Sequence, residues 1–218
     1  MCDRTKIILI RHGQSIGNLT RRFLGHTDLD LSELGYLQAK TTAEHLKNEK
    51  IDRIYSSDLK RAYNTALPHA EIRNLEIITS VNLREAYAGQ WEDMLVDDII
   101  EQWGKDFFVN QWKNNFGRHI FPGGESVEQS GNRFLSEILR IAEENTGKTV
   151  AIFAHAAVIR CFWALISNIS LDNICDQVPF ATNASYSICY YENGKITPFE
   201  YSNDTHLSEV GITKVSLI

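Results

Sequence analysis

The chain lacks several features that would assign it to a membrane, secreted or nucleic-acid-binding class. None of the apolar runs in its 218 residues approaches the ~20 residues that span a bilayer. The N-terminal stretch has an early acidic residue, Asp3, and no hydrophobic region of the kind that a signal peptide needs. A net charge of −6 leaves no general excess of basic residues for a phosphate backbone. We therefore expect a protein that binds neither membranes nor nucleic acids.

Cysteine is also scarce. The four cysteines lie far apart and form no C-x-x-C pair; they are Cys2, Cys161, Cys175 and Cys189. This spacing matches neither a zinc site nor a disulfide framework, and free thiols are typical of reducing compartments. We expect a cytoplasmic protein. The sequence leaves its oligomeric state, monomer or homodimer, open.

What the chain does have is an alternation of short apolar runs and helix-like segments. Continuous apolar runs bounded by charge predict buried strands, and hydrophobic residues three and four apart predict helices. Asn193-Gly194 is a strong turn dipeptide and predicts a hairpin of strands 185–191 and 195–201. This alternation favours an α/β layered domain. The other predicted strands are 6–10, 53–56 and 149–154, and the predicted helices are 32–50, 57 or 58 through 66, 126–145 and 156–167.

Polar residues at the start of these segments predict where the helices begin. Ser32 is an expected N-cap, and either Ser57 or Asp58 is expected to cap the second helix. Ser126 and Gln129 have the spacing of a capping box. These positions predict three helix starts.

Residues 92–121 differ in character from the rest, because aromatic side chains alternate there with acidic and amide ones. We expect one or two helices with a loop, forming a small helical lid or subdomain. Most of these aromatic side chains are expected to form the core of that lid. Trp91 is the first candidate for a side chain that reaches a substrate.

Polar chemistry follows three of the predicted strands. The first strand runs into Arg11 and His12, the third runs into His155, and Arg61 lies one helical turn after the second. Ligand sites in open α/β sheets gather at the carboxyl ends of strands, so these residues are expected to converge. Arginine offers a planar fork of donors to phosphate oxygens, and a neutral histidine can attack phosphorus. The pattern predicts a phosphate pocket that contains a nucleophile.

Two small residues are expected to complete this pocket. Gly13 permits backbone dihedrals that are closed to other residues, so the chain can wrap closely around the ligand. Ala156 follows His155 at the start of a predicted helix, where backbone amides favour a bound anion.

Five blocks of the sequence, in order, resemble the histidine phosphatase superfamily, which is also called phosphoglycerate-mutase-like. The blocks are RHG at 11–13, YSSDLKRAYNTA at 55–66, LREAYAGQWE at 83–92, PGGES at 122–126 and FAHAAVIR at 153–160. The resemblance covers most of the chain. It implies one domain over residues 1–218, built as a three-layer sandwich. A mostly parallel central sheet would carry helices on both faces, and 92–121 would be a helical lid insertion.

The resemblance also implies roles for individual residues. His12 would accept the phosphoryl group as phosphohistidine, and Glu85 would be the proton donor, although Glu92 and Glu125 are acids in equally family-like blocks. Arg11, Arg61 and His155 would complete the catalytic set. The substrate-binding residues would be Asn18, Arg22, Gly13, Ala156 and Trp91. Because the arginines and His155 neutralise the phosphate, no metal or other cofactor is expected.

Some positions depart from the family pattern. Gln14 stands where glutamate is commoner, and Asp93 and Ala156 stand where glycine is usual. None of these departures touches an expected catalytic residue, so catalytic competence is expected.

We expect a metal-independent phosphomonoester hydrolase of the phosphatase branch that acts on a small phosphorylated metabolite. A phosphoglycerate mutase is the alternative, but it needs extra cations for a second phosphate, and residues 92–121 are acidic and aromatic. A non-catalytic phospholigand-binding module and a metal-dependent hydrolase are further alternatives. The composition of the lid favours an uncharged or partly apolar leaving group.

Overall fold

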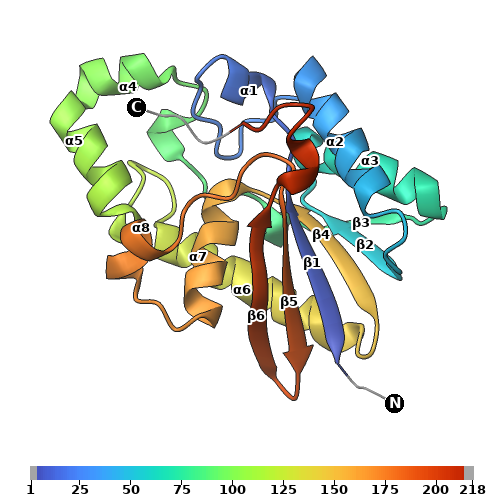
Figure 1. Cartoon of the computed structure of the whole chain (residues 1–218). Helices are drawn as coiled ribbons and strands as arrows, with labels where there is room; N and C mark the ends of the chain where they lie inside the picture. The colour runs from blue at the N-terminus through green and yellow to red at the C-terminus, as the bar shows by residue number, and fades with distance from the viewer. Residues whose placement is uncertain (1–3, 214–218) are drawn as a thin grey trace.

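A central sheet organises the computed structural model, which describes residues 4–213 (Figure 1). Its strands in that range are β1 (Thr5–Arg11), β2 (Arg53–Ser56), β3 (Ile77–Thr79), β4 (Thr149–Ala154), β5 (Tyr186–Glu192) and β6 (Lys195–Asn203). Their order across the sheet is β3-β2-β4-β1-β5-β6. The first four strands in this order are parallel, and the β5–β6 hairpin joins antiparallel to β1. The predicted α/β class with a mostly parallel sheet is confirmed.

Helices cover both faces of this sheet. The helices of residues 4–213 are α1 (Ile16–Leu19), α2 (Glu33–His45), α3 (Lys60–Arg73), α4 (Val96–Trp103), α5 (Lys105–Val109), α6 (Val127–Glu144), α7 (Ala156–Ile166) and α8 (Ile174–Gln177). On β1, Ile7 and Leu9 face the core shared with α6 and α7. Ile8 and Ile10 face the core that includes side chains of α3. Because β1 is buried on both faces, it is a continuous apolar run. The predicted three layers, with helices on both faces of the sheet, are confirmed.

The lid segment, residues 92–121, contains α4 and α5, and α5 continues into a π-helical turn at Asn110–Asn114. Phe108, Phe116 and Phe121 are buried in the same core as α6 and α7. The predicted helices with a loop are therefore present. Their aromatic residues join the lid to the body of the molecule.

Two of the predicted helix starts are confirmed. The side chain of Ser32 accepts a hydrogen bond from the amide of Gly35. Ser126 and Gln129 exchange hydrogen bonds in the predicted capping box at the start of α6. Helix α2 ends earlier than predicted, at His45 instead of residue 50.

The predicted cap of α3 is wrong. The helix begins at Lys60, and neither Ser57 nor Asp58 caps it with a side chain. The amide of Lys60 instead donates to Oδ1 of Asp28 at 2.7 Å. Asp58 accepts a hydrogen bond from Nε of Arg84 at 2.7 Å. Asp28, which is distant in the sequence, therefore accepts the hydrogen bond from the first amide of α3. Sequence patterns around the helix start do not predict such a partner.

The sequence pattern does not predict strand β3. The strand has three residues at the edge of the sheet, and two of them, Ile78 and Thr79, are exposed. A segment this short carries too few residues for an alternation to be recognised.

Candidate active site

The two histidines of the predicted pocket lie at adjacent strand ends. In the parallel pair, Arg11 of β1 stands opposite Ala154 of β4. The amide of His12 donates to the carbonyl of Ala154 at 3.0 Å, and His155 follows directly. The ring centroids of His12 and His155 are 5.2 Å apart. The strand register thus brings together two residues that are 143 positions apart in the sequence.

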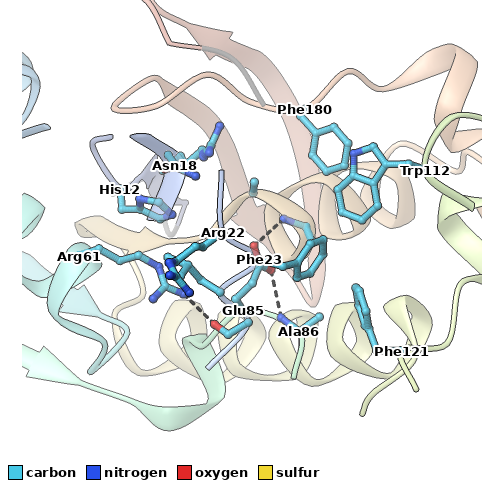
Figure 2. Close-up of a pocket in the computed structure, with 15 residues that line it drawn as sticks. His12, Asn18, Arg22, Phe23, Arg61, Glu85, Ala86, Trp112, Phe121 and Phe180 are labelled. Atoms are coloured by element: carbon cyan, nitrogen blue, oxygen red, sulfur yellow. Dashed lines mark hydrogen bonds between the residues drawn. The ribbon is translucent and has the colours of Figure 1, made fainter. Parts of the chain in front are cut away.

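A cavity opens at these strand ends, with an empty volume of about 600 Å³ that includes its open mouth. Figure 2 shows His12, Asn18 and Arg61 at one end of the cavity. Trp112, Phe121 and Phe180 stand at the other end. The cavity is lined by Arg11, His12, Asn18, Arg22, Phe23, Leu24, Gly25, Arg61, Glu85, Ala86, Trp112, Phe121, Ala156, Ala157 and Phe180.

Two buried arginines supply the positive charge at the polar end. Nη1 of Arg11 donates to the carbonyl of Ala181 at 2.6 Å. Arg61 donates from Nη1 to Thr27 and from Nη2 to Gly25, at 2.8 and 2.7 Å. Burial lowers the pKa of each arginine to about 10, so both stay charged at neutral pH. Each terminal nitrogen has two N–H groups, so these backbone contacts hold the guanidinium groups while leaving donors for an anion.

The ring of His12 is held in one tautomer. Its Nδ1 lies 2.7 Å from the carbonyl oxygen of Gly13, which can only accept, so Nδ1 carries the proton. Nε2 therefore keeps its lone pair. Burial, and then the charges of Arg61 and Arg11, hold the pKa of His12 well below its ordinary 6.5. The imidazole is neutral at physiological pH, which is the nucleophilic form.

His155 lies beside His12 and is fully buried. Neither of its ring nitrogens has a hydrogen-bond partner among residues 4–213. Burial lowers its pKa well below 6.5, with a further contribution from Arg61. Its backbone is the N-cap of α7, next to backbone amides that favour an anion, but His155 is not among the residues that line the cavity.

Of three nearby acids, only Glu85 lines the cavity. Its carboxylate accepts hydrogen bonds from the amides of Ala157, Val158 and Ala86, at 3.0, 3.1 and 3.1 Å. The first two amides belong to the first turn of α7 (Figure 2 draws the bonds to Ala86 and Ala157). The helix terminus thus fixes an acid at the cavity.

The other two acids are engaged in the framework. Glu92 accepts hydrogen bonds from the amides of His26, Thr27 and Ala88, at 2.7, 2.6 and 2.9 Å. Glu125 pairs with Arg133 at 2.8 Å. The structure therefore separates three glutamates that the sequence left as alternatives.

The expected substrate-binding residues Asn18 and Arg22 both line the cavity. Oδ1 of Asn18 accepts from the amide of Ser15 at 3.2 Å and from Nδ2 of Asn183 at 3.1 Å. The amide NH₂ of Asn18 is the part left to face a ligand. Arg22 lies nearer the surface, where its Nη1 donates to the backbone carbonyl of Asp93 at 2.6 Å.

Gly13 has a different role from the one expected. It is not among the residues with a positive φ and does not line the cavity. A Cβ atom at Gly13 would lie 2.5 Å from the carbonyl oxygen of Gly35 in α2. The position therefore requires glycine because of close backbone packing, not because of unusual dihedrals around a ligand. Ala156, in contrast, lines the cavity as expected.

Trp91 does not reach the cavity, contrary to the prediction. Its side chain is fully buried among aromatic rings, including Phe23, Phe121 and His119. Trp112 takes the expected place at the cavity. The packing of the lid decides which of the two tryptophans lines the cavity. The position of Trp91 near Glu85 in the sequence does not determine this packing.

Several residues at the cavity were not predicted. Phe180 lies in a connection between α8 and β5 that has no recognisable motif. Asn183 lies behind the cavity, where its Nδ2 donates to the backbone carbonyl of His12 at 3.0 Å as well as to Asn18. For the lid aromatics Trp112 and Phe121, the aromatic content of the segment was the available signal. The other unpredicted lining residues are Phe23, Leu24, Gly25, Ala86 and Ala157.

With this fold and this cavity, the chain belongs to the histidine phosphatase superfamily, branch 1, whose family model matches residues 7–213. Phosphoserine phosphatase 1 of Hydrogenobacter thermophilus is 35% identical over 94% of this chain and 95% of its own length. The metal-independent phosphoserine phosphatase of Arabidopsis thaliana is 32% identical over 95% of this chain and 85% of its own. A solved structure, Bacillus stearothermophilus YhfR, covers 94% of this chain and all of its own with a TM-score of 0.86 and 26% identity. The predicted family and enzyme class, a phosphoric monoester hydrolase, are confirmed.

Two features are absent from residues 4–213. No helix there is long and apolar enough to cross a membrane. No group of three or more histidine, cysteine, aspartate and glutamate side chains is placed there to hold a metal ion.

Proposed function

We propose that the protein hydrolyses phosphate monoesters of small metabolites through a phosphohistidine on His12. The observation that carries this proposal is the tautomer of His12. The Nδ1 proton is committed to Gly13, so the Nε2 lone pair is available for phosphorus. A nucleophile that is neutral at physiological pH needs no base to activate it.

The phosphate would bind between Arg11, Arg61 and Asn18, which line the cavity and supply N–H donors. His155 and the amide of Ala156, at the start of α7, add to this site. As His12 attacks in line, these donors stabilise the charge on the equatorial oxygens of the transferring group.

Glu85 would act as the general acid in the first step and as the general base in the second. In the first step its protonated carboxyl gives a proton to the oxygen of the departing alcohol as the ester P–O bond breaks and the N–P bond forms. In the second step the carboxylate takes a proton from the water that attacks phosphohistidine. That step releases inorganic phosphate and restores neutral His12. The three backbone amides around Glu85 hold it in one place for both steps.

The cavity favours hydrolysis over the mutase alternative. A mutase must hold a second phosphate, and the cation left for it among the lining residues is Arg22, which is already bonded to Asp93. The similar phosphoserine phosphatases support a small phosphorylated substrate.

Three further expectations belong to this proposal. The chain would form one catalytic domain whose lid, residues 92–121, covers the cavity, as the lining by Trp112 and Phe121 suggests. We also propose a cytoplasmic location, supported by the free cysteines Cys161, Cys175 and Cys189. Cys2 lies outside the described residues. The protein would act on small molecules and not on nucleic acids.

The decisive experiment compares the native protein with His12→Ala on an aryl phosphate in EDTA. The native protein should turn over, and it should carry an acid-labile phosphoryl group after rapid quenching. H12A should lose at least about 1,000-fold in kcat and show no labelled enzyme. His45→Ala is the control, because His45 is exposed at the end of α2. Activity retained by H12A, or abolished by EDTA, would overturn the mechanism.

A further inference from the structure

A buried arginine outside the cavity, Arg160 of α7, has no part in the chemistry described above. It ends the FAHAAVIR block and is 3% exposed. Its Nε donates to the carbonyl of Val178 at 2.6 Å, and its Nη2 donates to the carbonyls of Ile174 and Cys175 at 3.1 and 3.4 Å. An arginine buried without a carboxylate partner is costly, so its backbone bonds should serve the segment that it holds.

That segment carries Phe180 to the cavity. The guanidinium carbon of Arg160 lies 4.1 Å from the ring centroid of Phe180 and 4.9 Å from that of Phe116. Distances below about 6 Å allow cation–π attraction. Arg160 therefore fixes both the backbone before Phe180 and the ring itself.

Phe180 is the first of three rings that form a continuous wall. It stacks on Trp112, with centroids 5.4 Å apart and planes at 11°. Trp112 meets Phe23 edge to face at 5.4 Å and 84°. We call Phe23, Trp112 and Phe180 the aromatic wall; all three line the cavity. The rings come from the segment after α1, from the lid and from the segment after α8, and packing alone brings them together.

The wall stands where the leaving group of a bound ester would lie. In Figure 2, Trp112 and Phe180 lie at the end of the cavity opposite His12 and Arg61. A phosphate held by the arginines would therefore point its ester oxygen past Glu85 toward these rings. The three rings offer flat, uncharged apolar surface to the cavity, so the wall complements an apolar or aromatic substituent.

We propose that the aromatic wall is the specificity site for the alcohol part of the substrate, selecting phosphate monoesters whose alcohol carries a flat apolar group. Arg160 acts as a positioning residue that holds the wall. This inference rests on the proposed function, since it concerns the leaving group of the same reaction.

Two substrates with the same primary alkoxide leaving group test the inference, 2-phenylethyl phosphate and ethyl phosphate. They differ by one phenyl ring and little in leaving-group chemistry. In the native protein, kcat/KM should favour 2-phenylethyl phosphate by at least about 10-fold, because apolar contacts of this size discriminate by that order. A ratio near 1, with both esters hydrolysed, would overturn the inference while leaving the proposed function intact. Failure to hydrolyse either ester would count against the proposed function itself.

Variants of the wall make the test specific. Trp112→Ala and Phe180→Leu should each reduce the ratio at least about 3-fold, mainly through KM for the phenylethyl ester. Phe107→Ala is the matched control, because Phe107 is an exposed aromatic residue of α5 that does not line the cavity. A fall in the ratio in F107A as large as in W112A, or an unchanged ratio in both wall variants, would contradict the assignment.

Arg160→Met tests the positioning role. The methionine keeps the apolar stem and loses the guanidinium group, so the wall should loosen while the phosphate end stays in place. The ratio should fall toward that of F180L, with a smaller change in kcat/KM for ethyl phosphate. An equal loss on both esters would show a general structural role and overturn this part. If R160M does not fold, the two wall variants still decide the specificity site.

Discussion

At the scale of single residues, three glutamates near the cavity differ in their surroundings and in whether they face the cavity. Glu92 accepts hydrogen bonds from the amides of His26 and Thr27. It therefore stabilises the loop in which the carbonyl of Thr27 accepts a hydrogen bond from Arg61. Glu125 is paired with Arg133. Glu85 is bound by backbone amides only and faces the cavity. The side chains are chemically identical, and Glu92 also accepts from backbone amides, so contact with the cavity decides which one can exchange protons with a substrate.

Replacing Glu85 by glutamine should therefore affect poor leaving groups most. The amide cannot donate a proton to a departing alkoxide, so kcat/KM for ethyl phosphate should fall by about 10²–10⁴. With 4-nitrophenyl phosphate, whose phenolate leaves without a proton, the fall should be at least 10-fold smaller. Because kcat/KM reports the steps up to departure of the alcohol, later hydrolysis does not enter. Glu125→Gln is the control, and equal losses on both substrates would contradict the role of Glu85.

At the scale of elements, the start of α2 is packed directly against the turn that follows β1. A Cβ atom on Gly35 would lie 2.0 Å from the carbonyl oxygen of Gln14, and one on Gly13 would lie 2.5 Å from that of Gly35. Backbone cannot move aside as a flexible side chain does. The helix therefore helps to set the position of the Gly13 carbonyl that accepts the His12 proton.

Gly35→Ala should separate these two segments. We expect it to lower the free energy of unfolding by about 1–3 kcal/mol, as overpacked sites do, and to reduce kcat/KM because His12 loses its alignment. Urea unfolding and steady-state kinetics measure the two effects. Lys40→Ala, at an exposed position of the same helix, should leave both unchanged. Native-like stability of G35A would show that the backbone contact is looser than described.

At the scale of the whole molecule, burial of histidine couples stability to pH. Five of the seven histidines have a lowered pKa, with burial as the largest cause: His12, His69, His119, His155 and His206. For His69 the pKa falls to about 3, and for His119 and His206 to about 4. Below pH 6.5, the ordinary pKa of histidine, these side chains bind protons in the unfolded chain but stay neutral in the folded protein.

Stability should therefore fall as the pH drops from about 6.5 toward 4, by up to about 1.4 kcal/mol per pH unit for each such histidine. Urea unfolding at pH 7, 6 and 5 measures this slope. Carboxylates contribute at lower pH: the Arg140 hydrogen bond lowers the pKa of Glu137 below its ordinary 4.5, so its stabilising effect is lost only on further acidification.

His69→Leu isolates one histidine. His69 is fully buried against Phe153, and neither ring nitrogen has a partner among residues 4–213. The variant should keep its stability at pH 7. Below pH 6.5 its unfolding should take up about one proton fewer than that of the native protein, so its free energy of unfolding should depend less steeply on pH. A slope equal to that of the native protein would show that His69 is not among the groups that resist protonation.

The sequence by itself determined the features that depend on neighbouring residues. The apolar run of β1, the capping box at Ser126 and the Asn193-Gly194 hairpin each involve residues a few positions apart, where local geometry governs. The strand-end placement of Arg11, His12 and His155 also followed, because parallel strands align their carboxyl ends. Family motifs extended this to Arg61 and Glu85.

Only the tertiary structure decided which distant side chains meet. It selected Trp112 over Trp91 at the cavity, and it assigned the first amide of α3 to Asp28. It also stacked Phe180 on Trp112 and placed the guanidinium group of Arg160 against the ring of Phe180. These contacts join segments that are tens of residues apart, and they arise from packing and from the pairing of buried polar groups. No periodicity within one segment encodes such contacts, because the partner in each case belongs to another element.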